Sequence, residues 1–139
     1  MEWITDRTQA DVLLGNSKGT YSCGDLNRVE QGVQQLADLA QKLDIHYAPE
    51  IKPDWEIPGA FSADQWPVQS QMVRYLENVQ KLCLAVEVSM KLPDSMEQLT
   101  WEKANQIEQA LMAVQTQIQS VLQTFKFSGE LSAGEENGI

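Results

Sequence analysis

Residues 22–43, SCGDLNRVEQGVQQLADLAQKL, show the strongest helical pattern in the chain. Their apolar positions are separated alternately by three and four residues, which is the heptad spacing of a helix that packs on other helices. Those positions are Leu26, Val29, Val33, Leu36, Ala40 and Leu43. Ser22 stands where an N-cap is expected, and Asp25 three residues later nearly completes a capping box. We therefore predict a long helix from about residue 24 to residue 43.

The same helix start recurs near the C-terminus. Residues 22–31, SCGDLNRVEQ, align with residues 100–109, TWEKANQIEQ, in the cap residue, the apolar positions and several polar positions. The coinciding polar pairs are Asn27 with Asn105, Glu30 with Glu108 and Gln31 with Gln109. A weaker echo occurs in residues 71–79, QMVRYLENV, where Arg74 and Val79 match Arg28 and Val33. The sequence thus indicates one helical unit that is repeated three times.

Two further long helices are predicted. The second starts at Pro67, a favourable first helical residue, and ends before Leu92-Pro93. Its apolar positions are Val68, Met72, Tyr75, Val79, Leu82 and Val86. The third begins after Thr100, and its apolar positions are Ala104, Ile107, Leu111, Val114, Ile118, Val121 and Phe125. Between the two, residues 94–99 are predicted to make a single helical turn that packs Met96 and Leu99.

The remaining segments are shorter or irregular. A short N-terminal helix is predicted through Leu14, with Thr5 or Thr8 as its cap and a turn at residues 15–19. Residues 44–66 contain three prolines, which prevent a continuous helix. This connection also carries large apolar side chains, which we expect to lie against the bundle. They are Tyr47, Ile51, Trp55, Ile57 and Phe61.

Together these elements predict an all-α fold. We expect a three-helix bundle with a short extra N-terminal helix and a long loop, rich in proline and tryptophan, between the first two long helices. Residues 1–126 are expected to form a single helical-bundle domain, and residues 127–139 a short extended and partly loose acidic tail. Heptad stripes also suit a coiled coil, so a homo-oligomer remains an alternative. The extra apolar positions Leu39, Leu76, Cys83 and Leu122 favour a wide globular face.

The net charge of the chain bears on which classes of molecule it can bind. The chain of 139 residues has 20 acidic and 10 basic residues, a net charge of −10 and 42% apolar residues. Because the basic residues are scattered, we expect no nucleic-acid binding, although an acidic inhibitor that mimics DNA is an alternative. We find no signal-peptide pattern and no run of about 18 apolar residues, so we expect no membrane partner. We expect the protein to be cytoplasmic when it is synthesised.

The sequence offers little for catalysis. His46 is the single histidine, and Cys23 and Cys83 lack a CxxC partner, so no transition-metal site is predicted. Cys83 is expected to be a small core residue. Glu30 and Glu108 are interpreted as helix-surface acids near the first turn, where the helix dipole favours negative charge. We expect a protein that is not an enzyme, with no catalytic residues, no cofactor and no metal.

Five residues are candidate partner contacts: Trp3, Asn27, Arg28, Gln115 and Gln119. Trp3 looks exposed, and the two glutamines belong to a Gln-rich face of the last helix. Asn27, like its counterpart Asn105, has a structural alternative, which is a hydrogen bond to the preceding loop that fixes how the chain enters the helix. Arg28 and Arg74 are expected to pair with glutamates or loop carbonyls rather than with an anion.

Gly32 interrupts the first long helix at a cost of about 1 kcal/mol relative to alanine. It lies beside the predicted core position Val33. Either it lets a neighbouring helix or aromatic ring approach closely, or it is a tolerated surface glycine.

Five phrases follow a recognisable order: TDRTQADV, YSCGDLNRVEQGVQQLADL, KPDWEIPGAFSADQWPVQSQMVRYLENVQKL, LPDSMEQLTWEKANQIEQAL and FSGELSAGE. On these, nearly the whole chain resembles uncharacterised helical proteins and modules encoded in the tail and baseplate regions of prophages of Gram-positive bacteria. The most specific parts are DLNRVE at residues 25–30 and RYLENV at residues 74–79. Trp66 stands before Pro67 where a threonine cap is usual, which leaves the start of that helix open.

The resemblance implies a phage-structural or tail-associated role and supplies no catalytic residues. The leading hypothesis is therefore a non-enzymatic structural or interaction protein, associated with a prophage tail or baseplate, whose partners are other phage structural proteins. The alternative is a cytoplasmic assembly factor or helical adaptor that is not incorporated in the particle. The first hypothesis places the protein in the virion after its synthesis in the cytoplasm.

Overall fold

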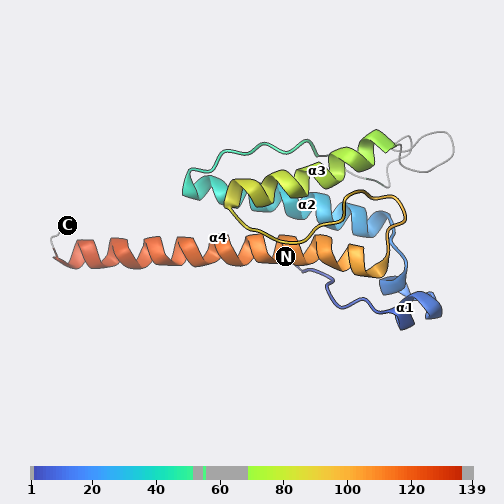
Figure 1. Ribbon diagram of the computed structural model, residues 1–139. Helices are drawn as coiled ribbons and strands as arrows, with labels where there is room; N and C mark the ends of the chain where they lie inside the picture. The colour runs from blue at the N-terminus through green and yellow to red at the C-terminus, as the bar shows by residue number, and fades with distance from the viewer. Residues whose placement is uncertain (1, 52–54, 56–68, 136–139) are drawn as a thin grey trace.

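The computed structural model describes residues 2–51, 55 and 69–135, except for the side chains of residues 69 and 125–135. In this part of the chain the fold is all-helical, as predicted, and contains no strand. The α-helices are α1 (Gln9–Leu14), α2 (Cys23–Ala40), α3 (Gln69–Val86) and α4 (Trp101–Glu135). Two short 3₁₀ helices, η1 (Ser17–Gly19) and η2 (Gln41–Leu43), follow α1 and α2 (Figure 1).

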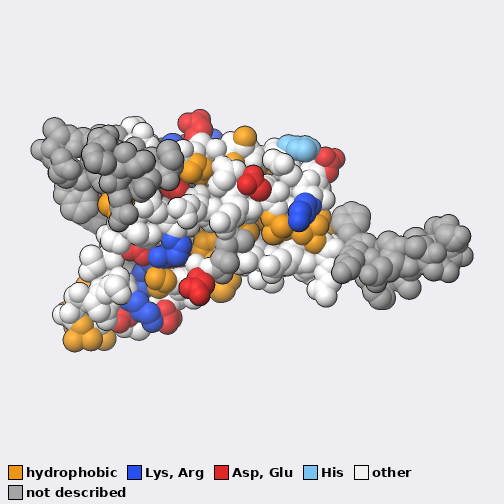
Figure 2. All heavy atoms as spheres, turned by 180° about the vertical axis from the view of Figure 1, so that it is seen from behind, with side chains coloured by type: hydrophobic (Ala, Val, Ile, Leu, Met, Phe, Trp, Pro, Cys, Tyr) orange, Lys and Arg blue, Asp and Glu red, His pale blue; other side chains and the backbone are white. Residues whose placement is uncertain are grey.

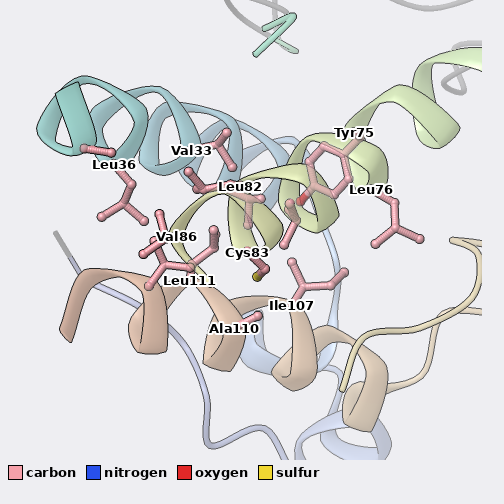
Figure 3. Close-up of a cluster of buried hydrophobic side chains, with 14 of the residues drawn as sticks. Val33, Leu36, Tyr75, Leu76, Leu82, Cys83, Val86, Ile107, Ala110 and Leu111 are labelled. Atoms are coloured by element: carbon pink, nitrogen blue, oxygen red, sulfur yellow. The ribbon is translucent and has the colours of Figure 1, made fainter. Parts of the chain in front are cut away.

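The three long helices contact one another around a common apolar core. Side chains of α2, α3 and α4 point toward the same centre (Figure 3). Most of the predicted heptad positions are buried, including Val29 and Leu36 of α2, Val79 of α3 and Leu111 of α4, whereas Leu43, Met72 and Val121 are partly buried. Cys83 is also in the core, as predicted. Helical spacing alone was therefore enough to identify most of the core.

Cap residues set the helix starts as the sequence indicated. Ser22 and Asp25 form a capping box at α2, and Thr8 and Asp11 form another at α1. Gly15 ends α1 with φ 66°, a left-handed conformation that glycine adopts without strain. Thr100 accepts a hydrogen bond from the backbone N–H of Lys103 at the start of α4.

Helix α3 ends earlier than predicted, at Val86 rather than just before Leu92-Pro93. Glu87 has φ 62°, and the N–H groups of Glu87 and Val88 donate to the carbonyls of Leu84 and Cys83. Asp44 (φ 62°) ends the α2–η2 segment with the same pattern of bonds. This is the Schellman arrangement, normally formed at glycine, so an acidic residue gave no sequence signal.

Two other predictions are wrong. Residues 94–99 form bends and a turn instead of a helical turn, although Met96 and Leu99 do pack on the core. The expected extended piece at the start of the tail is helical, because α4 continues through Glu135. Phe127 and Leu131 are four residues apart, a spacing that fits a helix at least as well as a strand.

The connection between α2 and α3 is described only in part. Trp55 is fully buried, and Tyr47 and Ile51 pack against the core, in agreement with the prediction. The predicted positions of Ile57 and Phe61, and the predicted helix start at Pro67, lie outside the described residues. Among the described helices, none is both long and apolar enough to cross a membrane.

Candidate interaction surface

The N-terminal segment, residues 2–7, is tied to α2 and α4 by a buried ionic cluster. We call Arg7, Asp25, Arg28 and Glu108 the Arg7 cluster. Asp25 is 4% exposed, Glu108 is 0% exposed and Arg7 is 3% exposed. Two arginines face two carboxylates, so the cluster is electrically balanced. Balance of this kind is what a buried charge requires, because an unpaired ion in the interior loses its hydration without compensation.

Glu108 is the centre of this cluster. One carboxylate oxygen accepts from Arg28 Nε at 2.8 Å and from the backbone N–H of Ile4 at 2.9 Å. The other accepts from Arg7 Nη2 and Arg28 Nη2, both at 2.7 Å. Hydrogen bonds from Arg28 to Glu108 and then to Asp25 raise the pKa of its guanidinium further. The two-pronged Arg28–Glu108 contact fixes orientation as well as charge.

Asp25 links the cluster to the start of α2. Its Oδ1 accepts from Arg28 at 2.6 Å and from Arg7 at 3.1 Å. Its Oδ2 accepts from the backbone N–H of Ser22 at 2.8 Å and so closes the capping box. One carboxylate therefore caps the helix and neutralises two arginines. The Arg7 guanidinium also lies 5.6 Å from the centroid of the Tyr21 ring.

A second buried pair holds the connection between α2 and α3. Arg74 Nη1 and Nη2 lie 2.6 Å and 2.9 Å from the two carboxylate oxygens of Glu30. Glu30 also accepts from the indole N–H of Trp55 at 2.5 Å. Arg74 further donates to the carbonyl of Glu50. Arg28 and Arg74 thus pair with glutamates and a loop carbonyl, as predicted, and the chain's three arginines all contact buried carboxylates.

Glu30 and Glu108 are not the helix-surface acids that the sequence suggested, since they are 2% and 0% exposed. A signal for this was present in the spacing. Glu30 comes four residues after Leu26 and three before Val33, which places it on the buried face. Glu108 has the same relation to Ala104 and Leu111. The position of these residues on the buried face of each helix therefore predicts their burial, whereas the helix dipole does not.

Three asparagines attach residues outside the helices to α2, α3 and α4. Asn105 accepts from the backbone N–H of Arg7 at 3.1 Å and donates to its carbonyl at 3.0 Å. Asn78 makes the same pair of bonds with Glu50, at 3.3 Å and 2.8 Å. Asn27 accepts from the backbone N–H of Trp55 at 2.7 Å. Asn27 and Asn105 thus do bond loop backbone, but in segments distant in sequence rather than in the loop that precedes each helix.

Trp3 lies across α2 and reaches α4. A Cβ atom at Gly32 would be 2.4 Å from Cη2 of the Trp3 ring, so only glycine accommodates the ring. The indole N–H of Trp3 donates to the side-chain oxygen of Gln115 at 2.8 Å. Of the two explanations for Gly32, the close approach of an aromatic ring is the one that the structure shows. Trp3 is half-buried rather than fully exposed.

Three of the five candidate contacts come together in one groove. Trp3, Asn27 and Arg28 line a cavity of about 340 Å³, together with Glu2, Gln31 and Gln35. Gln115 adjoins it through its bond to Trp3. Gln119 is exposed on the next turn of α4 and does not line this groove. Arg7, which the sequence did not single out, is the residue that holds the groove's N-terminal wall in place.

A second exposed surface lies at α1, whose six residues include none that is buried. Val12, Leu13 and Leu14 are 44%, 80% and 77% exposed. Figure 2 shows a group of apolar side chains at the end of the molecule that α1 occupies. A cavity of about 290 Å³ adjoins them, and Val12, Tyr21, Leu99 and Trp101 are among its lining residues. We call this apolar region, with Leu13 and Leu14, the α1 surface.

The described residues contain no group of three histidine, cysteine or acidic side chains that could hold a metal ion. His46 is exposed and lies 2.7 Å from Asp44, and burial raises the pKa of the Cys83 thiol to about 11. Comparison of the chain with family models, with curated proteins and with solved structures finds no match.

Proposed function

We propose that this chain is a non-enzymatic interaction protein, folded as a three-helix bundle, and that it is a component of a prophage tail or baseplate. The observation that carries the interaction role is the α1 surface. Leu13 and Leu14 are about four-fifths exposed on a helix that contributes no buried residue to the core. Contiguous exposed apolar side chains of this kind mark protein contacts more often than isolated ones do.

The setting of α1 supports a contact role. The ends of the helix are closed by its capping box and by Gly15, and the N-terminal segment before it is tied to α2 and α4 by the Arg7 cluster. Contacts that order a surface before it binds reduce the conformational entropy lost on binding, which favours affinity. The polar rim includes the exposed ion pair of Asp6 with Lys18 at 2.8 Å. An apolar centre with a polar rim is the usual anatomy of a protein interface.

The resemblance to prophage tail-region proteins supplies the assembly in which this contact would be made. The length of α4 agrees with such a role. Its 35 residues span about 52 Å, whereas the 18 residues of α2 span about 27 Å. The C-terminal part of α4 therefore extends beyond the other helices (Figure 1). An extended element of this kind offers a second point of attachment in a multi-chain particle.

The test is mass spectrometry of particles purified after induction of the strain that carries the prophage. We expect this chain at a fixed ratio to the known tail proteins. A chromosomal Leu13→Ser/Leu14→Ser variant should be lost from the particles, because the contact loses its apolar centre. Particles that assemble fully without the wild-type chain would overturn the tail assignment and would favour the assembly factor or adaptor.

Leu84→Ser is the matched control. Leu84 is 76% exposed on α3 and lies outside the α1 surface, so this variant should still enter the particle. Circular dichroism of each purified variant should show the wild-type melting temperature, because none of the three leucines is buried. Equal loss of the Leu84 variant would show that the effect is not specific to α1.

A further inference from the structure

A groove beside α3, at the edge of the core, combines an apolar floor with an acidic rim. It encloses about 430 Å³ between α3 and the turn at residues 94–97. Met72, Val73 and Met96 provide apolar surface above the buried Leu76, and Glu77, Asp94 and Glu97 provide the carboxylates. A volume of this size lies within the range of ~300–1,000 Å³ that binding pockets have. The groove shares no lining residue with the α1 surface.

The charges of this groove are not compensated within it. None of its described lining residues is a lysine or an arginine. The three carboxylate-bearing residues are all exposed, and their side chains make no hydrogen bond or ion pair with another residue in the described part of the chain. This contrasts with Asp25, Glu30 and Glu108, each of which contacts an arginine. A rim of one sign attracts a partner of the opposite sign.

We infer that this groove binds a basic amphipathic helix of another protein. The apolar residues of such a helix, at spacings of three and four, would lie on Met72, Val73 and Met96, while flanking lysines or arginines would meet the three carboxylates. Methionine is flexible and polarizable, so a methionine-containing floor adapts to apolar side chains of different shape. Val73, which is 48% exposed at the edge of the groove, adds apolar surface that a partner would cover.

A second copy of this chain is a poorer occupant than a basic partner. Each copy carries a net charge of −10, so two copies repel each other. The part of α4 that extends beyond the other helices contains Glu130 and Glu135 against a single Lys126, which does not match an acidic rim. Charge complementarity therefore favours a basic helix from a different chain.

The probe is a fluorescein-labelled 18-residue peptide with leucines at helical spacing and lysines on both flanks, titrated with the full-length protein and followed by anisotropy. The matched peptide has glutamate in place of every lysine. We expect micromolar binding of the basic peptide and at least tenfold weaker binding of the acidic one. Binding of the basic peptide should weaken several-fold between 50 mM and 300 mM NaCl, because salt screens the rim. Equal binding of the two peptides would overturn the inference.

Two triple variants separate the groove from the overall charge. Glu77→Gln/Asp94→Asn/Glu97→Gln should weaken binding of the basic peptide at least tenfold. Asp38→Asn/Asp44→Asn/Glu102→Gln changes the net charge equally at exposed positions outside the groove, so its binding should stay within twofold of wild type. If the two triple variants weaken binding equally, the attraction is non-specific and the inference fails.

The apolar floor has its own test. Val73→Gln should weaken binding several-fold at both salt concentrations, whereas Leu84→Gln, an exposed change on the same helix, should not. The Leu13→Ser/Leu14→Ser variant should bind the peptide as the wild type does. Loss of that variant from particles and loss of peptide binding by the rim variants are therefore independent results, so either proposal can fail without the other.

Discussion

Glu108 shows how much one side chain can depend on its partners. It is fully buried and accepts hydrogen bonds from Arg7, Arg28 and the backbone of Ile4. Removing one member of a buried ion cluster is costly mainly because the remaining charge stays buried without compensation. The same argument does not hold for exposed pairs, which solvent and salt already screen.

Glu108→Gln should therefore lower the free energy of unfolding by about 3–5 kcal/mol, measured by urea denaturation followed by circular dichroism. Asp6→Asn is the matched control, because Asp6 also pairs with a cation but its side chain is 70% exposed. The control should leave the urea midpoint nearly unchanged. Equal shifts in the two variants would contradict the burial of the Arg7 cluster.

Substitution by alanine should have opposite effects on stability at Gly32 and at Gly24, which lie in the same helix. Gly32→Ala should destabilise the protein by about 1–3 kcal/mol, since its Cβ would overlap the Trp3 ring. At Gly24 the Cβ would meet only Ser22 Oγ at 3.4 Å, so alanine should be neutral or slightly stabilising.

In a Trp3→Ala background the sign at Gly32 should reverse. Alanine then has room and gains up to about 1 kcal/mol of helix propensity. Urea midpoints of the four combinations form a double-mutant cycle that isolates the contact. A Gly32→Ala penalty that persists without the Trp3 ring would show that another neighbour, and not Trp3, requires the glycine.

At the scale of helices, the sequence repeat corresponds to a repeated use of side chains. Asn27 and Glu30 of α2 hold Trp55, as Asn105 and Glu108 of α4 hold the N-terminal segment. In each case an amide bonds backbone outside the helices, and a glutamate one turn later accepts hydrogen bonds from an arginine. The repeat is thus one of chain attachment as well as of core packing.

Local signals in the sequence predicted the starts of α1, α2 and α4 and most of the core, because caps and heptad spacing act within a few residues. The Arg7 cluster was missed because Arg7 meets Glu108 across 101 residues, and no local pattern encodes that pairing. The end of α3 was missed because Glu87 takes a left-handed conformation that usually signals glycine. The sequence identified Trp3, Asn27 and Arg28 as candidate contacts, but it did not predict that they line one groove.

The two halves of α4 should differ in their dynamics. Among the described side chains of α4, which end at Thr124, the buried ones extend to Ile118, and Leu122 is the last that packs on the core. Hydrogen exchange followed by mass spectrometry should therefore show strong protection up to about residue 118 and weak protection beyond residue 122, because a helix without tertiary packing opens readily. Uniform protection through residue 135 would instead indicate that another chain packs on this part, and protection that decreases on dilution would identify that chain as a second copy.

Across the whole molecule, the core contains ionisable groups that remain neutral when they are buried. Burial raises the pKa of Cys83 from 9.0 to about 11 and that of Tyr75 well above 10.0. These groups keep their protons in the folded state at pH values where the unfolded chain has lost them. The stability that they contribute is complete below the unfolded pKa and is lost as the pH rises toward the folded pKa.

Stability should therefore fall as the pH rises above about 9, with about 2 kcal/mol of the loss due to Cys83 by pH 11. Urea midpoints at pH 7 to 10.5 for the wild type and Cys83→Ala check this. The variant is less stable at pH 7 because of its cavity. Its stability should decline less steeply with pH, because the thiol no longer contributes, and the unchanged tyrosines account for the decline that remains. Parallel decline in both proteins would contradict a role for the Cys83 thiol.

The three arginines have one more consequence, which concerns chemical labelling. Because each guanidinium contacts a buried carboxylate and is at most partly exposed, the lysine and arginine side chains that are exposed on the described surface are all lysines. Amine-selective cross-linkers should therefore report the neighbours of the folded protein. A dicarbonyl reagent selective for guanidinium should react slowly until the N-terminal segment or the α2–α3 connection detaches. The rate at which Arg7 is modified would then report detachment of the N-terminal segment, and the rate at Arg74 would report detachment of the α2–α3 connection.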